Sequence, residues 1–412
     1  MKIKVVFLTF YHEAWDALDE IHRIMLADPR FEVVVASIPR RLTGDSGFGG
    51  EEVTSAFFDA QGISHVRLNS TDGEQSLKQL RQLTPDVVFI NYPWQRNYQP
   101  VLRVARLIEF TRVAYVPYYS LPLVNEPGDT GVAPHLFEQR SHQLASMVFT
   151  QDRSVLDAYA HTDRGNGYIH LTGTPKIDRL MRLAAEGTAT WPLPGRRFRI
   201  VWAPHHSYSA GWLNFGVFAS THRMMLRLAI SHPEIDFVLR PHPFLFGTLV
   251  DRGVLSQTEL DDWLADWRDQ ANTAIHTDGE YASLFKATDL LVTDGISFIG
   301  EYPLVTGRPT VFFENEGHWE FSPLGELAAA ASIRLSDFEQ FETLLDEIRT
   351  VGLPDRSSEV AALKRAASPF PGEAAKRIVE VVAQNARQPL VDPASVHTLA
   401  WELREGREPQ VD

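Results

Sequence analysis

The sequence predicts an α/β protein made of two doubly wound domains, each with a parallel sheet, that face each other across a cleft. Its 412 residues exceed one ordinary core and suit two domains of about 150 to 200 residues each. Short β-forming runs alternate with longer helical patterns in both halves, which is typical of parallel sheets joined by crossover helices. A stretch rich in glycine and proline interrupts both patterns near the middle of the chain.

The first half contains short apolar runs separated by helical patterns. Strands are expected at Ile3–Thr9, Phe31–Ser37, Asp86–Ile90, Val113–Val116 and Met147–Thr150. Helices are expected near residues 13–27, 73–83, 97–109, 134–144 and 152–160.

The second half repeats this plan. Strands are expected at Arg199–Ala203, Asp236–Leu239, Leu290–Thr293 and Thr310–Phe313. Helices are expected near residues 214–231, 258–270, 296–303 and 337–350.

Domain boundaries follow from the breaks in these patterns. Residues 1–183 are interpreted as an N-terminal Rossmann-like acceptor domain, and residues 184–197, with Trp191-Pro-Leu-Pro-Gly, as a linker. Residues 198–385 are interpreted as a C-terminal Rossmann-like nucleotide-donor domain. Residues 386–412 form a charged, proline-containing tail, with a helix expected around 394–404.

Composition excludes several classes of protein. A formal net charge of −14 argues against broad nucleic-acid binding, which usually leaves a basic footprint. The absence of cysteine excludes disulfides and thiolate-ligated zinc and fits a reducing compartment. No stretch is apolar enough to span a membrane. We therefore expect a cytoplasmic protein, with peripheral contact to the inner face of the membrane left open.

The first candidate site segment is Arg240-Pro-His242-Pro, which follows an expected strand. Proline fixes its own φ and restricts the residue before it, so His242 should project from the strand end with little backbone freedom. A proline-bounded turn in which His242 merely packs is the alternative.

The second segment runs from Thr293 through Asp294, Gly295 and Ser297 to Glu301, at the end of a strand and the start of a helix. Helix N-termini with free N–H groups are ready anion sites, so Ser297 could donate to a phosphate and Glu301 could reach ribose hydroxyls. Ordinary N-capping by Asp294 or Ser297 is the competing interpretation.

The third segment is His205-His206-Ser207, again at an expected strand end. Adjacent side chains of extended backbone point in opposite directions, so only one of the two imidazoles should face a shared site. A structural role is the alternative for either histidine. Because the carboxyl ends of parallel strands lie along one edge of a sheet, we expect all three segments to meet there.

In the first half, aromatic and polar residues follow expected strands. An acceptor-binding surface or a base belongs at such positions, although solvated helix-capping residues would look the same. The candidates are Tyr11, His12, Tyr92, Trp94, Arg96, Tyr118 and Tyr119. No Walker loop, zinc-protease motif or Asp-x-Asp pair is present, so neither a metal nor a cofactor is expected.

Together, these second-half segments and Leu171-Thr-Gly173-Thr174-Pro-Lys-Ile-Asp178 resemble the CDP-glycerol glycerophosphotransferase family of teichoic acid and capsule synthesis, over about residues 168–315. The resemblance implies the GT-B fold, two facing Rossmann-like domains. It also implies a donor site with His242 as the residue that binds or activates the pyrophosphate. Arg240, His205, Ser207, Gly173 and Thr174 and the 293–301 segment would complete the donor site.

This sequence departs from the family pattern in the first half. The family commonly carries an acceptor-side histidine there, whereas Val113 to Ser120 contain none, so His12 or His206 would have to supply the base. In the second segment, Ile296 stands where the family commonly has a serine and Glu301 where it has an aspartate.

The reaction that the resemblance implies is transfer of a glycerol-phosphate or similar polyol-phosphate group from a CDP-activated donor to a polymer or lipid-linked acceptor, with release of CMP. Phosphoryl transfer needs positioning and charge stabilisation more than covalent help. A GT-B glycosyltransferase of capsule or lipopolysaccharide synthesis is the nearest alternative. A sugar-nucleotide epimerase, which the segment Thr172 to Asp178 also resembles, and a non-catalytic nucleotide-binding partner stay open.

Overall fold

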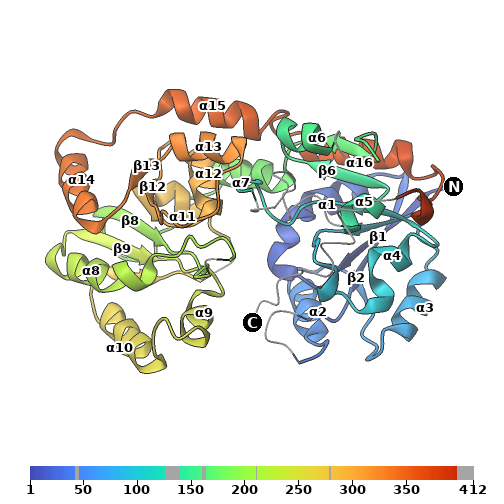
Figure 1. Ribbon diagram of the computed structural model, residues 1–412, viewed down its shortest axis with the longest axis horizontal. Coiled ribbons are helices and arrows are strands. Elements are labelled where there is room, and N and C mark those ends of the chain that lie inside the picture. The colour runs from blue at the N-terminus through green and yellow to red at the C-terminus, as the bar shows by residue number, and fades with distance from the viewer. Residues whose placement is uncertain (42–45, 126–139, 160–163, 210, 278–279, 397–412) are drawn as a thin grey trace. The chain divides into compact units, whose positions relative to one another are not determined.

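The computed structural model describes residues 1–41, 46–125, 140–159, 164–209, 211–277 and 280–396 (Figure 1). The chain forms two compact units. The first contains the described residues of Met1–Ser120, Thr130–Arg179 and Ser368–Asp412, and the second those of Leu121–Asp129 and Leu180–Ala367. Within the described residues, no helix has the length and apolar character needed to cross a membrane.

The first unit is built on a seven-stranded sheet whose strands are all parallel, in the order β3-β2-β1-β4-β5-β6-β7. Its strands alternate along the chain with helices, as the sequence predicts. The strands are β1 (Ile3–Thr9), β2 (Phe31–Ser37), β3 (His65–Arg67), β4 (Val87–Ile90), β5 (Arg112–Tyr115), β6 (Met147–Thr150) and β7 (Ile169–Leu171).

Helices cover both faces of this sheet, because the strands are apolar on both sides. One face packs against α3 (Glu74–Gln82), α4 (Val104–Leu107), α5 (Arg140–Leu144) and α6 (Arg153–Tyr159). The other face packs against η1 (His12–Ala17), α1 (Asp19–Ala27), α2 (Glu51–Ala60) and α16 (Ala374–Asn385). Three short 3-10 helices complete the unit: η2 (Gln95–Asn97), η3 (Pro100–Leu102) and η4 (Pro393–Ser395).

The second unit repeats the architecture with a six-stranded parallel sheet in the order β10-β9-β8-β11-β12-β13. Both sheets therefore extend outward from their first strand in two directions, which is the doubly wound plan. The strands are β8 (Phe198–Ala203), β9 (Ile235–Leu239), β10 (Thr273–Ile275), β11 (Leu290–Thr293), β12 (Val311–Phe313) and β13 (Ile333–Leu335).

The helices of the second unit form a layer on each side of its sheet (Figure 1). One core contains residues of α8 (Phe218–Ser231), α9 (Leu245–Asp251), α10 (Gln257–Arg268) and α14 (Phe338–Val351). On the opposite side lie α11 (Ala282–Ala287), α12 (Ile296–Thr306) and α13 (Pro323–Ala330), and α15 (Ser357–Ala367) contacts α12 and α13. The two parallel-sheet α/β domains predicted from the sequence are confirmed.

The chain divides between the units differently from the sequence interpretation. The division falls within α7 (Pro175–Glu186), and residues 187–197 pack on the second unit instead of forming a free linker. Trp191 and Arg197 donate to the two carboxylate oxygens of the buried Asp236, at 2.9 and 2.8 Å. Helix α16, interpreted as part of the second domain, packs on α1 of the first unit.

One expected helix is broken, and two others lie partly outside the described residues. The helix expected at 97–109 is broken into η3 and α4. Of the helix expected at 134–144, only α5 lies within the described residues, and most of the one expected at 394–404 lies outside them.

Candidate functional site

Three polar loops leave the second sheet at its topological switch point. Strands β8 and β11 are neighbours in the middle of this sheet, and β9 lies beside β8. His205 follows β8, His242 follows β9 and Asp294 follows β11. In doubly wound sheets, ligands bind beyond the carboxyl ends of the strands at this switch point. The structure therefore brings together the three segments that the sequence singled out in the second half.

Asp294 holds the loop that carries His205. Its carboxylate accepts hydrogen bonds from the backbone N–H groups of His205, at 2.5 Å, and Val217, at 2.6 Å. The side chain is only 2% exposed, and this burial raises the pKa of Asp294 to about 7, although the backbone donors act in the opposite direction. Asp294 was predicted to bind the donor, but both of its oxygens are already engaged in fixing the 205–217 loop.

Thr293 and Gly295 also serve the architecture of the site. The hydroxyl of Thr293 donates to the carbonyl of Ala203, at 2.6 Å, and accepts from the N–H of Gly295, at 2.9 Å. A Cβ atom at Gly295 would lie 3.3 Å from the His205 side chain, so the absence of a side chain allows close packing there. These contacts join the ends of β8 and β11.

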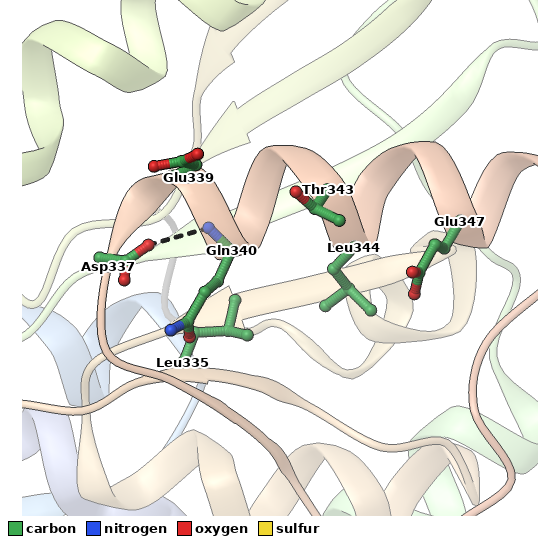
Figure 2. Close-up of a pocket in the computed structure, with 7 residues that line it drawn as sticks. All are labelled: Leu335, Asp337, Glu339, Gln340, Thr343, Leu344 and Glu347. Atoms are coloured by element: carbon green, nitrogen blue, oxygen red, sulfur yellow. Dashed lines mark hydrogen bonds between the residues drawn. The ribbon is translucent and has the colours of Figure 1, made fainter.

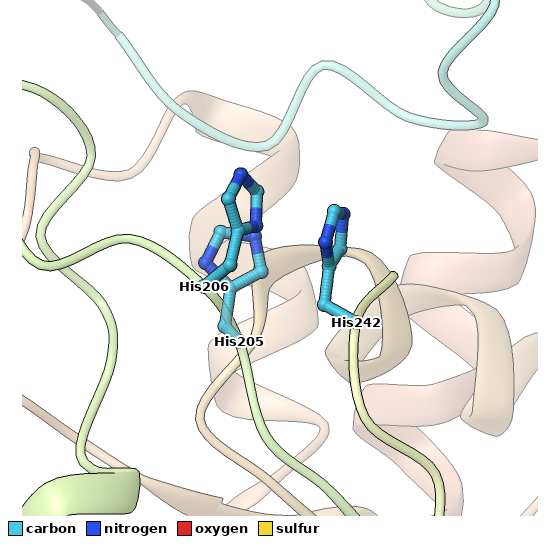
Figure 3. Close-up of side chains that lie close together, drawn as sticks. All are labelled: His205, His206 and His242. Carbon is cyan, nitrogen blue, oxygen red and sulfur yellow. The ribbon is translucent and has the colours of Figure 1, made fainter. Parts of the chain in front are cut away.

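Three imidazoles form the centre of the site. Figure 3 shows His206 and His242 side by side, with His205 next to His206. The ring centroids of His206 and His242 are 3.7 Å apart, with an interplanar angle of 20°, and those of His205 lie 4.6 and 5.4 Å from His206 and His242. His205 is buried, whereas His206 and His242 are half-buried. The expectation that only one of His205 and His206 faces the site is therefore wrong, because β8 ends at Ala203 and both histidines lie in the loop after it, where side chains need not alternate as in a strand.

The hydrogen bonds around these rings set their orientation. Nδ1 of His205 lies 2.8 Å from the hydroxyl of Ser207, which also accepts from the N–H of Phe215 at 2.9 Å. Nδ1 of His242 accepts from the N–H of Phe244 at 3.2 Å. The His242 N–H in turn donates to the carbonyl of Pro204, at 3.1 Å, which ties the loop after β9 to the loop after β8.

Burial keeps all three histidines neutral. It lowers the pKa of His205 and of His242 well below the usual value, and the neighbouring imidazoles lower both further. Burial also lowers the pKa of His206 to about 4, with a smaller contribution from the positive charge of Arg252. At neutral pH, each ring therefore offers one N–H donor and one lone pair.

The other predicted donor-binding residues of the second unit are Ser297, Arg240 and Glu301, and each has separate contacts. Ser297 is exposed in the first turn of α12, which has no side-chain cap. The Arg240 guanidinium lies over the Tyr281 ring, 4.7 Å from its centroid, and donates to Nδ1 of His276 at 2.6 Å. Tyr281 donates to the carboxylate of Glu301, at 2.5 Å, and Glu301 is only 1% exposed.

Gly173 and Thr174 lie in the first unit, in the loop after β7. Gly173 has a φ of +79°, which favours glycine, and the hydroxyl of Thr174 donates to the carbonyl of Ser120 at 2.8 Å. This hydrogen bond is internal to the first unit.

Four tyrosines gather beyond the carboxyl ends of β1, β4 and β5 in the first unit. The rings of Tyr11, Tyr92 and Tyr118 lie within 4.9–5.9 Å of one another, and Tyr119 is 5.4 Å from Tyr118. All four are half-buried, and burial raises the pKa of each phenol, so the hydroxyls stay protonated at neutral pH. The structure thus joins most of the predicted acceptor-binding residues in one aromatic cluster.

The remaining first-unit candidates have separate surroundings. Nδ1 of His12 lies 3.2 Å from the carboxylate of Glu13, and the His12 ring packs against Phe57. Burial lowers the pKa of His12. Trp94 and Arg96 are half-buried at the start of the loop after β4.

Sequence reasoning missed two residues close to the imidazoles. Phe244 packs against the His206 and His242 rings, with centroids 5.8 and 5.4 Å away, and its N–H orients His242. Arg252 at the end of α9 is exposed and has no ion pair with any other described residue. No sequence signal marks Arg252, since exposed arginines are common at helix ends.

A shallow depression of about 410 Å³ lies along α14, away from the histidines in the chain (Figure 2). Asp337, Glu339 and Glu347 line it, and Asp337 already accepts the N–H of Gln340 as the helix cap, at 2.9 Å. No positively charged side chain among the described residues lines the depression, so it does not suit a phosphate.

Ser207→Ala tests the support of the site. Because the buried hydroxyl accepts from Phe215 and contacts His205, we expect its loss to lower the free energy of unfolding by about 1–3 kcal/mol. Denaturant titration of the variant measures this change. Ser231→Ala, at an exposed position of α8, is the matched control and should change stability by less than about 0.5 kcal/mol. Equal effects of the two substitutions would contradict the role assigned to Ser207.

Comparison with protein-family models finds no match, and comparison with curated proteins finds no significant one. Solved structures match over nearly the whole chain. A UDP-N-acetylglucosamine 2-epimerase has a TM-score of 0.63 at 14% identity, over 95% of this chain and 99% of its own. The UDP-GlcNAc 2-epimerase from Neisseria meningitidis, bound to UDP-GlcNAc, has a TM-score of 0.61 at 15% identity, over 93% and 100%.

The wall teichoic acid polymerase TagF, soaked with CDPG, is also similar, with a TM-score of 0.54 at 14% identity, over 95% of this chain and 90% of its own. At such identities the likeness shows the fold. The chain has the GT-B fold of two Rossmann-like domains.

Proposed function

We propose that this chain is an enzyme that binds a nucleotide-diphosphate-linked sugar beside the histidine cluster of its second unit and acts on the bound sugar. The observation that carries the proposal is the convergence of His205, His206 and His242 at the switch point of a doubly wound sheet. Among sugar-nucleotide reactions, we favour epimerisation. Most of the similar structures named above are UDP-GlcNAc 2-epimerases, and they match with higher TM-scores than TagF.

The surroundings of the cluster suit a diphosphate. Arg252 is an exposed guanidinium whose charge acts on His206, and α12 begins with uncapped N–H groups after Gly295. Helix N-termini and guanidinium groups both favour anions. Neutral imidazoles add hydrogen-bond donors of fixed orientation, which stabilise charge that develops on a leaving phosphate.

Transfer of a polyol phosphate from a CDP-activated donor is the second candidate. It is favoured by the likeness to TagF and by the Arg240-Pro-His242-Pro segment, whose histidine lies in the cluster. The aromatic cluster of Tyr11, Tyr92, Tyr118 and Tyr119 would then provide a surface for the acceptor, since aromatic faces pack against apolar parts of a ligand while phenol hydroxyls bond to its polar groups.

Nucleotide binding is tested with the melting temperature of the protein in the presence of UMP, UDP, UDP-GlcNAc, CMP, CDP and CDP-glycerol. A ligand at about 100 times its Kd stabilises the folded state by about 2.7 kcal/mol. We expect the uridine diphosphate compounds to raise the melting temperature most. A response limited to cytidine compounds would favour the second candidate, and no response to any nucleotide would contradict both.

Product analysis separates the reactions. An epimerase converts UDP-GlcNAc to its C2 epimer without any acceptor, which proton NMR detects as a new anomeric signal. A polyol-phosphate transferase leaves UDP-GlcNAc unchanged and releases CMP from CDP-glycerol only when an acceptor is present. Release of UDP that depends on an acceptor would instead identify a glycosyltransferase.

A further inference from the structure

We propose that His205, His206 and His242 bind a divalent transition-metal ion, with Zn²⁺ as the preferred species. The three residues each offer one ring nitrogen, and these nitrogens all lie within 4.8 Å of one another (Figure 3). The metal-binding inference stands on this geometry. Only its extension to catalysis, in which the ion would take an oxygen of the bound diphosphate, rests on the proposed function.

The nitrogens are available as ligands. Nδ1 of His206 is buried and has no hydrogen-bond partner, which is costly for a polar atom that no ligand contacts. Nδ1 of His242 accepts the N–H of Phe244 in a long hydrogen bond of 3.2 Å, which an ion bound to this nitrogen would displace. Nδ1 of His205 contacts the hydroxyl of Ser207, which leaves Nε2 of that ring for an ion. Burial keeps these imidazoles neutral, and neutral imidazole is the form that binds metals.

The donor set selects the class of metal. Imidazole nitrogens suit Zn²⁺ and its transition-metal neighbours, whereas Mg²⁺ and Ca²⁺ prefer oxygen ligands. Three histidines with an open fourth position are a known arrangement for catalytic zinc. Zn–N bonds of about 2.1 Å place tetrahedral ligands about 3.4 Å apart, so the ion would draw the rings together. Rotation about the terminal side-chain torsion, which is soft for histidine, allows this movement.

The supports of the cluster match those of metal sites. Ligating histidines usually bond through the second ring nitrogen to a neighbouring polar group, which fixes the ring. The hydroxyl of Ser207 bonds in this way to Nδ1 of His205, and it also accepts the N–H of Phe215. The backbone of His242 is anchored to Pro204, and Asp294 anchors the backbone of His205.

The test uses the full chain, freed of metal by a chelator and then titrated with Zn²⁺ alone. Calorimetry and elemental analysis should find one Zn²⁺ per chain, and Co²⁺ should give the visible absorption of a tetrahedral site. Loss of the groups that hydrogen-bond to the metal ligands costs metal sites about 10- to 100-fold in affinity. Removal of a ligand in His206→Ala or His242→Ala should therefore weaken binding by at least about 100-fold.

The control variant is His232→Ala, since His232 is partly exposed at the end of α8 and pairs with Glu234. It should bind Zn²⁺ as the wild type does. Circular dichroism checks that every variant is folded. The inference is overturned if the wild type binds no Zn²⁺, or if all variants bind it equally. If the wild type binds no Zn²⁺ but still responds to nucleotides, the metal inference alone fails and the proposed function stands.

Discussion

Under the proposed function, replacing His242 with alanine is expected to lower turnover of the nucleotide-linked substrate by about 100- to 1,000-fold, because a preoriented donor at a developing charge contributes that much to catalysis. The fold should survive. His242 is half-buried, and the hydrogen bond that its ring accepts from the Phe244 N–H is long, at 3.2 Å. The measurement is the steady-state rate with the substrate identified by the nucleotide panel, together with the melting temperature of the free variant.

Two companion variants make this experiment specific. His242→Gln keeps an amide donor at the position and should recover part of the lost rate. His232→Ala removes a histidine that lies outside the cluster and should leave the rate unchanged. If His242→Ala is folded and turns over substrate at nearly the wild-type rate, His242 is not part of the catalytic machinery.

The strands that form the centre of each sheet could be predicted from the sequence because they are buried on both faces. The runs Val5–Leu8 and Leu290–Val292 are continuously apolar, and the strands that contain them, Ile3–Thr9 and Leu290–Thr293, occur with the expected bounds. The outer strands β3, β7, β10 and β13 were missed. They have only three residues each, and edge strands of that length carry no periodic pattern.

The meeting of the three loops could be predicted by the same logic, whereas the contacts made by their residues could not. Prolines beside His242 and the strand end before His205 marked the loops, and the fold gathers them. Contact between His206 and His242 depends on the path of the loop after β8, which no spacing rule predicts. The role of Asp294 was also hidden, since a carboxylate that accepts two backbone N–H groups looks in sequence like one that faces a ligand.

Domain assignment failed at the end of the chain for a similar reason. Helix α16 follows the second unit in sequence and carries an ordinary apolar stripe, which fits any core. Only its tertiary contacts assign this helix to the first unit. Ile378 and Val382 are buried with Phe7 and Met25 of the first unit, and Asp178 accepts the N–H of Ala374 at 2.9 Å. A packing partner so far away in the sequence produces no recognisable pattern in the local sequence of the helix.

The second large effect is expected from Asp294→Asn, which should change how stability depends on pH. Folding raises the pKa of Asp294 from 3.8 to about 7, chiefly by burial, so the folded state holds a proton that the unfolded state has released. Asp294 therefore contributes fully to the free energy of unfolding of the wild type below pH about 4. This contribution, on the order of 4 kcal/mol, is lost as the pH rises to about 7.

Asparagine cannot ionise, so the stability of the variant should not fall in this way as the pH rises. It keeps one acceptor oxygen but turns an amide N–H₂ toward one of the two backbone donors, from His205 or Val217, and the unpaired donor should cost about 1–3 kcal/mol. We expect the variant to be less stable than the wild type at pH about 4 and to close or reverse this gap by pH about 8. Denaturant unfolding across this pH range measures the difference in stability between the two proteins. The neighbouring histidines affect stability with the opposite pH dependence, but they are present in both proteins, so their effect cancels in this difference. Parallel stability curves for the two proteins would show that Asp294 is ionised throughout and that its carboxylate is held by the backbone donors alone.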